Sequence, residues 1–129
     1  MAKMLNFGGH IRATDVSNIE SAKVIPVSGT PGSNLEIQTT RDAGKEVIIF
    51  SIVLNNNRTD QTNVKVNLFV FPEDNANKKV SVGGGVIVIP GRPVSLDYKI
   101  NLKPNDSMYV TYSGGNAGDC DILISAVQM

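Results

Sequence analysis

The chain offers few residues that could perform covalent chemistry. His10 is its one histidine and Cys120 its one cysteine, so a nucleophile–base pair would have to combine one of them with a residue brought near by the fold. Asp119 and Asp121 flank Cys120, and neighbouring carboxylates disfavour the reactive thiolate. One histidine and one cysteine cannot supply the ligands of a zinc site. These observations favour a protein that is not an enzyme.

Two further segments have the composition of a binding loop. Residues 73–77 combine two carboxylates with two asparagine side chains, and such oxygen ligands suit a hard cation. The segment lacks the D-x-D-x-D-G pattern of a calcium loop, so we interpret it as a solvated turn. The glycines at 83–85 lack the lysine and the following helix of a phosphate-binding loop. We expect a β-bulge or a bend at these glycines. For the protein as a whole we expect neither a metal nor an organic cofactor.

Charge and hydropathy narrow the class of partner. The 129 residues contain 12 basic and 12 acidic side chains, and no basic run gives the electrostatic footprint expected for nucleic acid or an anionic membrane. The longest apolar run, residues 47–54, is far too short for a membrane-spanning helix. The N-terminal segment lacks the apolar core of a secretory signal, and a single cysteine permits no intrachain disulfide. We expect no nucleic acid or membrane partner, and synthesis in a reducing compartment.

The elements that would have to position any site are β-strands. In residues 95–102, every second side chain from Leu96 to Leu102 is apolar, which is the period of a half-buried strand. Turns rich in proline, glycine and asparagine bound this run at 90–93 and 103–106. The same criteria predict strands at residues 22–28, 35–40, 46–54, 63–72, 78–82, 86–90, 108–113 and 121–127.

Eight or nine short strands with regularly spaced turns predict an all-β fold, an antiparallel β-sandwich of the jelly-roll type. No segment has the length and helical period of a crossover connection, which argues against a parallel sheet. Residues 46–54 are apolar on both faces, as in a central strand that is covered on both sides. The apolar positions of residues 1–20 keep no clean period. We therefore predict an extended N-terminal arm or a loosely docked lead-in over 1–20 and a single sandwich domain over 21–129.

Apolar side chains in excess of one core mark candidate contacts with other proteins. Phe69 and Phe71 lie on the more polar face of the predicted strand at 63–72. The alternative for this pair, a stacking platform for single-stranded nucleic acid, lacks flanking basic residues. The candidate protein-interface residues are Leu5, Phe7 and Ile11 in the predicted arm, together with Phe69 and Phe71.

Residues 45–129 resemble small virion proteins of tailed bacteriophages. That family combines an apolar strand, a polar loop and an alternating strand with a Pro-Gly turn, a pair of strands around a Gly-Asp-Ser turn, and a closing strand that ends in serine. Here Asn105 stands where the family more often has glycine, which suits a turn position with positive φ. The residues that carry the resemblance are Ile89-Pro90-Gly91, Leu96 to Leu102, Asn105-Asp106-Ser107 with Tyr109-Val110, and Asp121 to Ser125.

The resemblance implies a non-enzymatic β-sandwich subunit of the virion, made in the host cytoplasm. The leading hypothesis is a capsid decoration or cement protein that binds the major capsid protein lattice, forms homo-oligomers on the particle and reaches a neighbour with its N-terminal arm. The first alternative is a subunit of the phage neck or tail. An alternative of another class is a carbohydrate- or ligand-binding jelly-roll module, although a chain without tryptophan and with three tyrosines has few rings on which a sugar could stack.

Overall fold

The computed structural model describes residues 2–11, 22–25, 42, 44–71, 80–97, 99–113 and 120–129. Within these residues the chain forms nine β-strands and no helix, which confirms the all-β prediction. The strands are β1 (Lys3–Ile11), β2 (Ala22–Ile25), β3 (Val47–Asn56), β4 (Val64–Phe71), β5 (Val80–Val88), β6 (Val94–Leu96), β7 (Ile100–Leu102), β8 (Ser107–Ser113) and β9 (Cys120–Gln128).

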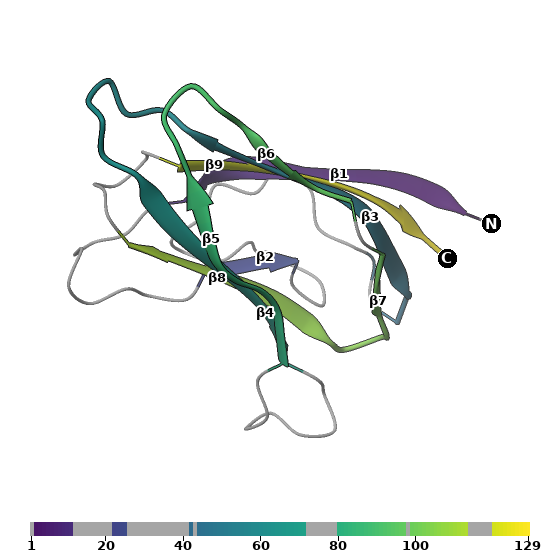
Figure 1. Ribbon diagram of the computed structural model, residues 1–129. Helices are drawn as coiled ribbons and strands as arrows, with labels where there is room; N and C mark the ends of the chain where they lie inside the picture. Colours follow the sequence, from purple (N-terminus) through teal and green to yellow (C-terminus); the bar gives the residue numbers. More distant parts are fainter. Residues whose placement is uncertain are drawn as a thin grey trace.

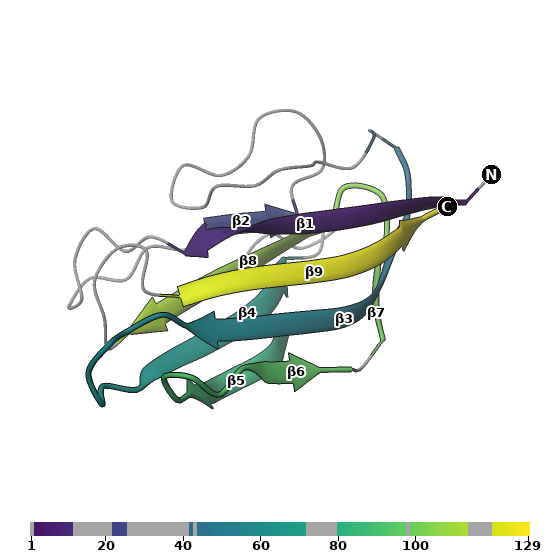
Figure 2. The ribbon, with the colours of Figure 1, turned by 90° about the horizontal axis from the view of Figure 1, so that it is seen from above.

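The strands form two antiparallel sheets that lie one above the other (Figure 1). The five-stranded sheet has the order β1-β9-β3-β6, and β7 pairs with another stretch of β3. The four-stranded sheet has the order β2-β8-β4-β5. Figure 2 looks onto the five-stranded sheet, in which β1 lies at one edge and β9 lies between β1 and β3.

The order of the strands is that of one long hairpin rolled into two layers. β4 pairs with β5 at the tip of this hairpin, and β3 pairs with β6 and β7. β2 then pairs with β8, and β1 pairs with β9 at the open end. Such nested pairing across two sheets is the topology of a jelly roll. The first and last strands are therefore neighbours, with Lys3 opposite Gln128.

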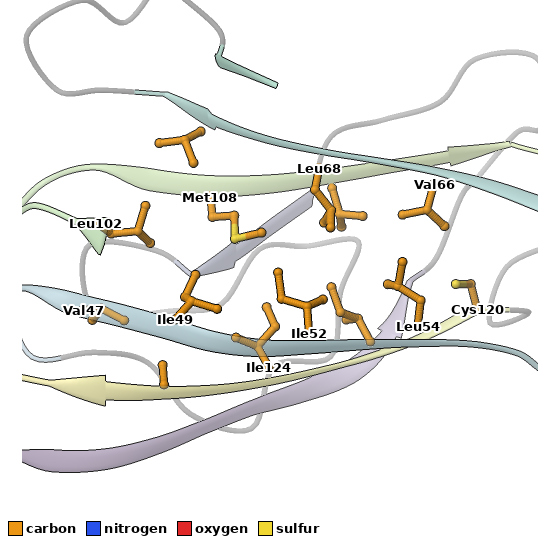
Figure 3. Packing of buried hydrophobic residues seen from close by; sticks show 14 of the residues in the cluster. Val47, Ile49, Ile52, Leu54, Val66, Leu68, Leu102, Met108, Cys120 and Ile124 are labelled. Atoms are coloured by element: carbon orange, nitrogen blue, oxygen red, sulfur yellow. The ribbon is translucent and has the colours of Figure 1, made fainter. Parts of the chain in front are cut away.

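The hydrophobic core fills the space between the inner faces of the two sheets (Figure 3). Ile52 and Ile124 enter it from the five-stranded sheet, and Leu68 and Met108 enter it from the four-stranded sheet. All four side chains are fully buried, and shortening such a side chain to alanine costs about 2–5 kcal/mol. The core also contains Val64, Val66, Leu68 and Val70 of β4, which form the more apolar face of the strand predicted at 63–72, and Ile122, Ile124 and Ala126 of β9.

The N-terminal segment corrects the prediction of an arm. Residues 3–11 form β1, which pairs with β9 along its whole length without a shift in register. Leu5 is buried in the core. Gly8 and Gly9 lower the strand propensity of this segment, and its partner lies more than a hundred residues away in the sequence, so its local pattern alone did not predict a strand. Residues 12–21 lie outside the described residues, and the single domain over 21–129 stays a prediction.

The strand predicted at residues 95–102 is interrupted. β6 and β7 both pair with β3, but the pairing shifts by one residue between Leu96↔Ile52 and Ile100↔Ile49. β3 contains a β-bulge at the same point, because its register with β9 also shifts between Ile49 and Ser51. Between these two pairs the partner has three residues, 97–99, and β3 has two, so an extra residue on the partner side separates β6 from β7. The predicted inward face is otherwise retained, although Tyr98 lies outside the described residues.

The remaining predictions concern the strand at 35–40, the turn at 73–77 and the segments around the glycines at 83–85. The strand at 35–40 and the turn at 73–77 fall outside the described residues. The glycines at 83–85 lie inside the continuous strand β5, so the separate strands predicted on either side of them are wrong. The register between β4 and β5 shifts on both sides of the Leu68↔Gly83 pair, as expected for the predicted bulge.

Two turns have the geometry that their sequences predict. In Ile89-Pro90-Gly91-Arg92, the N–H of Arg92 donates to the carbonyl of Ile89 at 3.0 Å, and Gly91 has a φ of 77°. In residues 103–106, Asp106 donates to the carbonyl of Lys103 at 3.1 Å, and Asn105 has a φ of 72°. Proline second and positive φ third are the features of a type II turn. The expectation for Asn105 is confirmed.

Substitutions at Asn105 test this turn. Asn105→Gly should change the free energy of unfolding by about 0.5 kcal/mol or less, because glycine adopts positive φ freely. Asn105→Ala should lower it by about 1–2 kcal/mol, the cost of a Cβ in the left-handed region. Gly91→Ala should lower it by a similar amount, because Gly91 also has positive φ, and an added Cβ there meets nothing within 4 Å, so that backbone strain alone is measured. Urea unfolding measures all three, and an Asn105→Ala variant as stable as the wild type would contradict the assignment.

Candidate interaction surface

The outer face of the five-stranded sheet carries apolar and polar side chains in alternating rows. Pairing aligns Met4 and Ile48 with Val127, and it aligns Asn6 and Ser51 with Ser125. We call the side chains of these rows that point away from the core the outer face. Its described members are Met4 and Asn6 on β1, Ile48, Phe50, Ser51, Val53 and Asn55 on β3, and Asp121, Leu123, Ser125 and Val127 on β9.

Several apolar side chains of the outer face are open to solvent. Met4 is 62% exposed, Leu123 is 51% exposed and Phe50 is 41% exposed. Ile48 and Val53 are only half-buried beside them. An antiparallel sheet with one solvated face normally carries polar residues on it. We therefore treat the outer face as a candidate interaction surface.

The bulge in β3 brings Phe50 to this surface. Ile49 pairs with Ala126 and Ser51 pairs with Ser125, so Phe50 is the extra residue of β3 at that point. The shift keeps both Ile49 and Ile52 buried in the core, although they are three residues apart. The same irregularity therefore maintains the core and leaves an exposed aromatic ring on the outside.

Hydrogen bonds fix a polar border at one end of the outer face. Asn57 donates from Nδ2 to Oδ2 of Asp121 at 2.5 Å, and Asn55 donates to Oδ1 of Asn57 at 2.6 Å. Buried Asn56 donates to the carbonyls of Thr62 and Val88 at 3.1 and 2.9 Å. An apolar centre with a polar border is the usual composition of a protein–protein interface.

At the opposite end of the sheet, hydrogen bonds connect the end of β9 to residues that precede β3. Gln128 accepts a hydrogen bond from the backbone N–H of Asp42 at 2.8 Å and donates to Oδ2 of Asp42 at 2.9 Å. Lys3 lies 3.7 Å from the same carboxylate. The bond from Gln128 and the charge of Lys3 lower the pKa of Asp42. Met129 donates to the carbonyl of Glu46 at 2.9 Å, so the described end of the chain is held against the start of β3.

The structure describes the side chains of two of the predicted interface residues, Leu5 and Phe69. Leu5 lies in the core, so its assignment to an interface is wrong. Phe69 is 4% exposed and stacks on Tyr109, with ring centroids 6.1 Å apart and planes 3° from parallel. Phe7, Ile11 and Phe71 belong to β1 and β4, but their side chains lie outside the described part of the structure, and their role stays a prediction.

The sequence analysis missed Met4, Phe50 and Leu123. The signal was present in residues 46–54, whose two faces are both apolar, but it was interpreted as coverage on both sides. The structure instead leaves the second face of β3 partly open. On β9, Leu123 is an apolar residue between Asp121 and Ser125, which are polar and point to the same side of the strand.

The described residues contain no group of histidine, cysteine or carboxylate side chains that could hold a metal ion. Cys120 is buried, and its Sγ lies 3.7 Å from the carbonyl oxygen of Asp121. His10 lies on β1 opposite Asp121. Among the described segments, none is a helix long and apolar enough to cross a membrane.

No protein-family model and no curated protein sequence matches the chain. Its backbone does resemble solved structures. A chain in the structure of infectious bursal disease virus, Gx strain, matches over 99% of this chain and 32% of its own length, with a TM-score of 0.52 and 11% identity. At this identity the likeness shows the fold alone, a β-rich domain consistent with a β-sandwich.

Two weaker likenesses have TM-scores below 0.5 and carry no argument. A chain of the T13 particle of the same virus gives 0.47 at 7% identity, over 99% of this chain and 31% of that one. The xylanase 10B CBM22-1–GH10 modules of Clostridium thermocellum give 0.38 at 12% identity, over 97% and 25%. The chain spans about a third of the length of the viral chains, and the virus concerned is not a tailed bacteriophage.

The loop beside the outer face predicts a pH dependence of stability. The hydrogen bond from Arg58, at 2.8 Å, and the backbone N–H of Thr62 hold the pKa of Asp60 well below its ordinary value of 3.8. A carboxyl whose pKa is lower in the folded state stabilises the fold above its unfolded pKa, and this contribution is lost as the pH falls. Thermal melting of the wild type and Asp60→Asn should therefore differ most near neutral pH, with the wild type more stable. The difference should shrink below about pH 4. A difference that does not depend on pH would contradict this role for Asp60.

Proposed function

We propose that this protein is a non-enzymatic structural component of a virion, a capsid decoration or cement protein of a tailed bacteriophage. In this proposal the outer face of the five-stranded sheet docks on the lattice of the major capsid protein. The observation that carries the proposal is the exposure of Met4, Phe50 and Leu123 on a rigid sheet. Burial of such side chains on a partner is favourable, because each square ångström of apolar surface removed from water gains about 25 cal/mol.

The fold supports this proposal in a second way. Jelly rolls occur in viral capsid proteins, and also in lectins and cupins. The backbone matches a chain of a virus particle over 99% of this chain, and the pattern of residues 45–129 resembles phage virion proteins. A chain without tryptophan and with three tyrosines has few rings on which a sugar could stack, which disfavours the carbohydrate-binding alternative.

Binding of this kind would stabilise the shell by mass action. A ligand that binds an assembled state and not the dissociated one shifts the equilibrium toward assembly. The neutral balance of charge fits attachment by apolar contact and shape, with the Asn55–Asn57–Asp121 border supplying hydrogen bonds at one end. Such a protein requires no reactive residue.

Binding to particles tests the proposal with a matched pair of variants. Leu123→Glu places a charge on the outer face, and Ile87→Glu places one at a residue of β5 in the other sheet with nearly the same exposure, 51% against 49%. Each exposed substitution should change the free energy of unfolding by about 0.5 kcal/mol or less. Leu123→Glu should weaken binding to purified particles at least tenfold, about 1.4 kcal/mol, while Ile87→Glu binds as the wild type does.

The site of binding on the particle separates the related hypotheses. Stoichiometric decoration of the capsid faces is the result expected for a cement protein. Binding confined to one vertex would instead assign the protein to the neck or tail. Failure of the wild type to bind particles, with saturable binding to an oligosaccharide, would overturn the virion hypothesis. Equal binding of particles by Leu123→Glu and Ile87→Glu would show that the outer face is not the docking surface.

A further inference from the structure

The free edges of the two sheets differ in how well they resist pairing with another strand. An edge strand presents unpaired N–H and C=O groups, and proteins usually protect such edges with short strands, bulges or charge. At one edge of the five-stranded sheet, β6 and β7 have three residues each and are separated by residues 97–99. In the four-stranded sheet, β2 has four residues with a register shift, and the β5 edge has two shifts. Three edges are thus protected.

The fourth edge, formed by β1, is neither short nor bulged, and its one charged residue, Lys3, lies at its end. β1 has nine residues, and its pairing with β9 runs from Lys3↔Gln128 to Ile11↔Cys120 without a shift. It contains neither proline nor an acidic residue. Among the described strands, none pairs with its other side, where it forms the border of the sheet (Figure 2). Gly8 and Gly9 in its interior lack side chains, and glycine inside a strand often marks close approach of another backbone.

We propose that β1 pairs with β1 of a second copy of this chain, antiparallel across a two-fold axis, which joins the two five-stranded sheets into one continuous sheet. In such a two-fold interface the same strand edge of both copies is in contact. It satisfies the outward backbone groups of both edges in one step. The proposal does not depend on the virion function, since a two-fold dimer can form in solution.

Charge favours a second copy in this antiparallel orientation. Lys3 is the one formal charge on β1, and it lies at one end beside Asp42, 3.7 Å away. In an antiparallel pair the two Lys3 residues lie at opposite ends of the interface. A parallel pair would bring them together, and like charges facing each other across strands are destabilising. The chain as a whole has no net charge, so two copies approach without long-range repulsion.

The dimer would also extend the outer face. Met4 and Asn6 are exposed on β1, in the rows of Val127 and Ser125. Pairing through β1 places the outer faces of two copies side by side in one sheet. A side chain near the middle of β1 on this face, such as Asn6, then lies close to its counterpart in the other copy, whereas Asn101 on β7 lies at the far edge.

Asn6→Lys and Asn101→Lys test the proposal on the full chain. Sedimentation equilibrium of the wild type should give a monomer–dimer equilibrium. Asn6→Lys places two like charges near the centre of the paired strands and should raise the dimer dissociation constant about fivefold or more. Asn101→Lys, also exposed on the five-stranded sheet, should leave the dissociation constant unchanged. Thermal melting of the diluted monomers verifies that both variants fold.

Cross-linking gives an independent readout of the same contact. Asn6→Cys should form covalent dimers with a short bismaleimide, and Asn101→Cys should not. Cys120 is buried and should not react in the folded chain. A wild type that stays monomeric up to its highest soluble concentration would overturn the proposal. So would an oligomer that Asn6→Lys leaves intact, or one that cross-links through Asn101→Cys.

Discussion

The register of β9 between β1 and β3 is the constraint on which the rest of the structure depends. It buries Ile122, Ile124 and Ala126 in the core and leaves Asp121, Leu123 and Ser125 on the outside. A slip of one residue would exchange the two sets, because side chains alternate strictly along a strand. Core and outer face are therefore two results of the same pairing. The bulge at Phe50 fits β3 to this register.

The parts of the fold that depend on local pattern could be predicted from the sequence. Alternation placed Val64, Val66, Leu68 and Val70 in the core, and proline with a following glycine or asparagine located both turns. β1 could not be predicted in this way, because its stability comes from a partner at the other end of the chain. The break between β6 and β7 depends on their register with β3, which lies far away in the sequence. Such long-range causes leave little trace in a short window of sequence.

The candidate surface could be predicted only in part, for a related reason. The residues of β3 indicate that both of its faces are apolar, but they do not indicate whether a second layer covers the outer one. In this structure the four-stranded sheet covers one face alone, and Phe50 remains exposed. Conversely, the sequence predicted that Phe69 is available for an interface, but its ring is buried and stacks on Tyr109. The exposed apolar side chains of the outer face are the observation on which the proposed role in assembly rests.

Covalent footprinting of side chains on purified particles tests the central claim most directly. The protein would be labelled by a photoactivated carbene, free and after binding to phage particles that lack it, and the modified residues located by mass spectrometry. If the outer face docks on the shell, labelling of Phe50 and Leu123 falls on binding, while labelling of Ile87 in β5 is unchanged. Unchanged labelling of Phe50 and Leu123 on particle-bound protein would contradict the account.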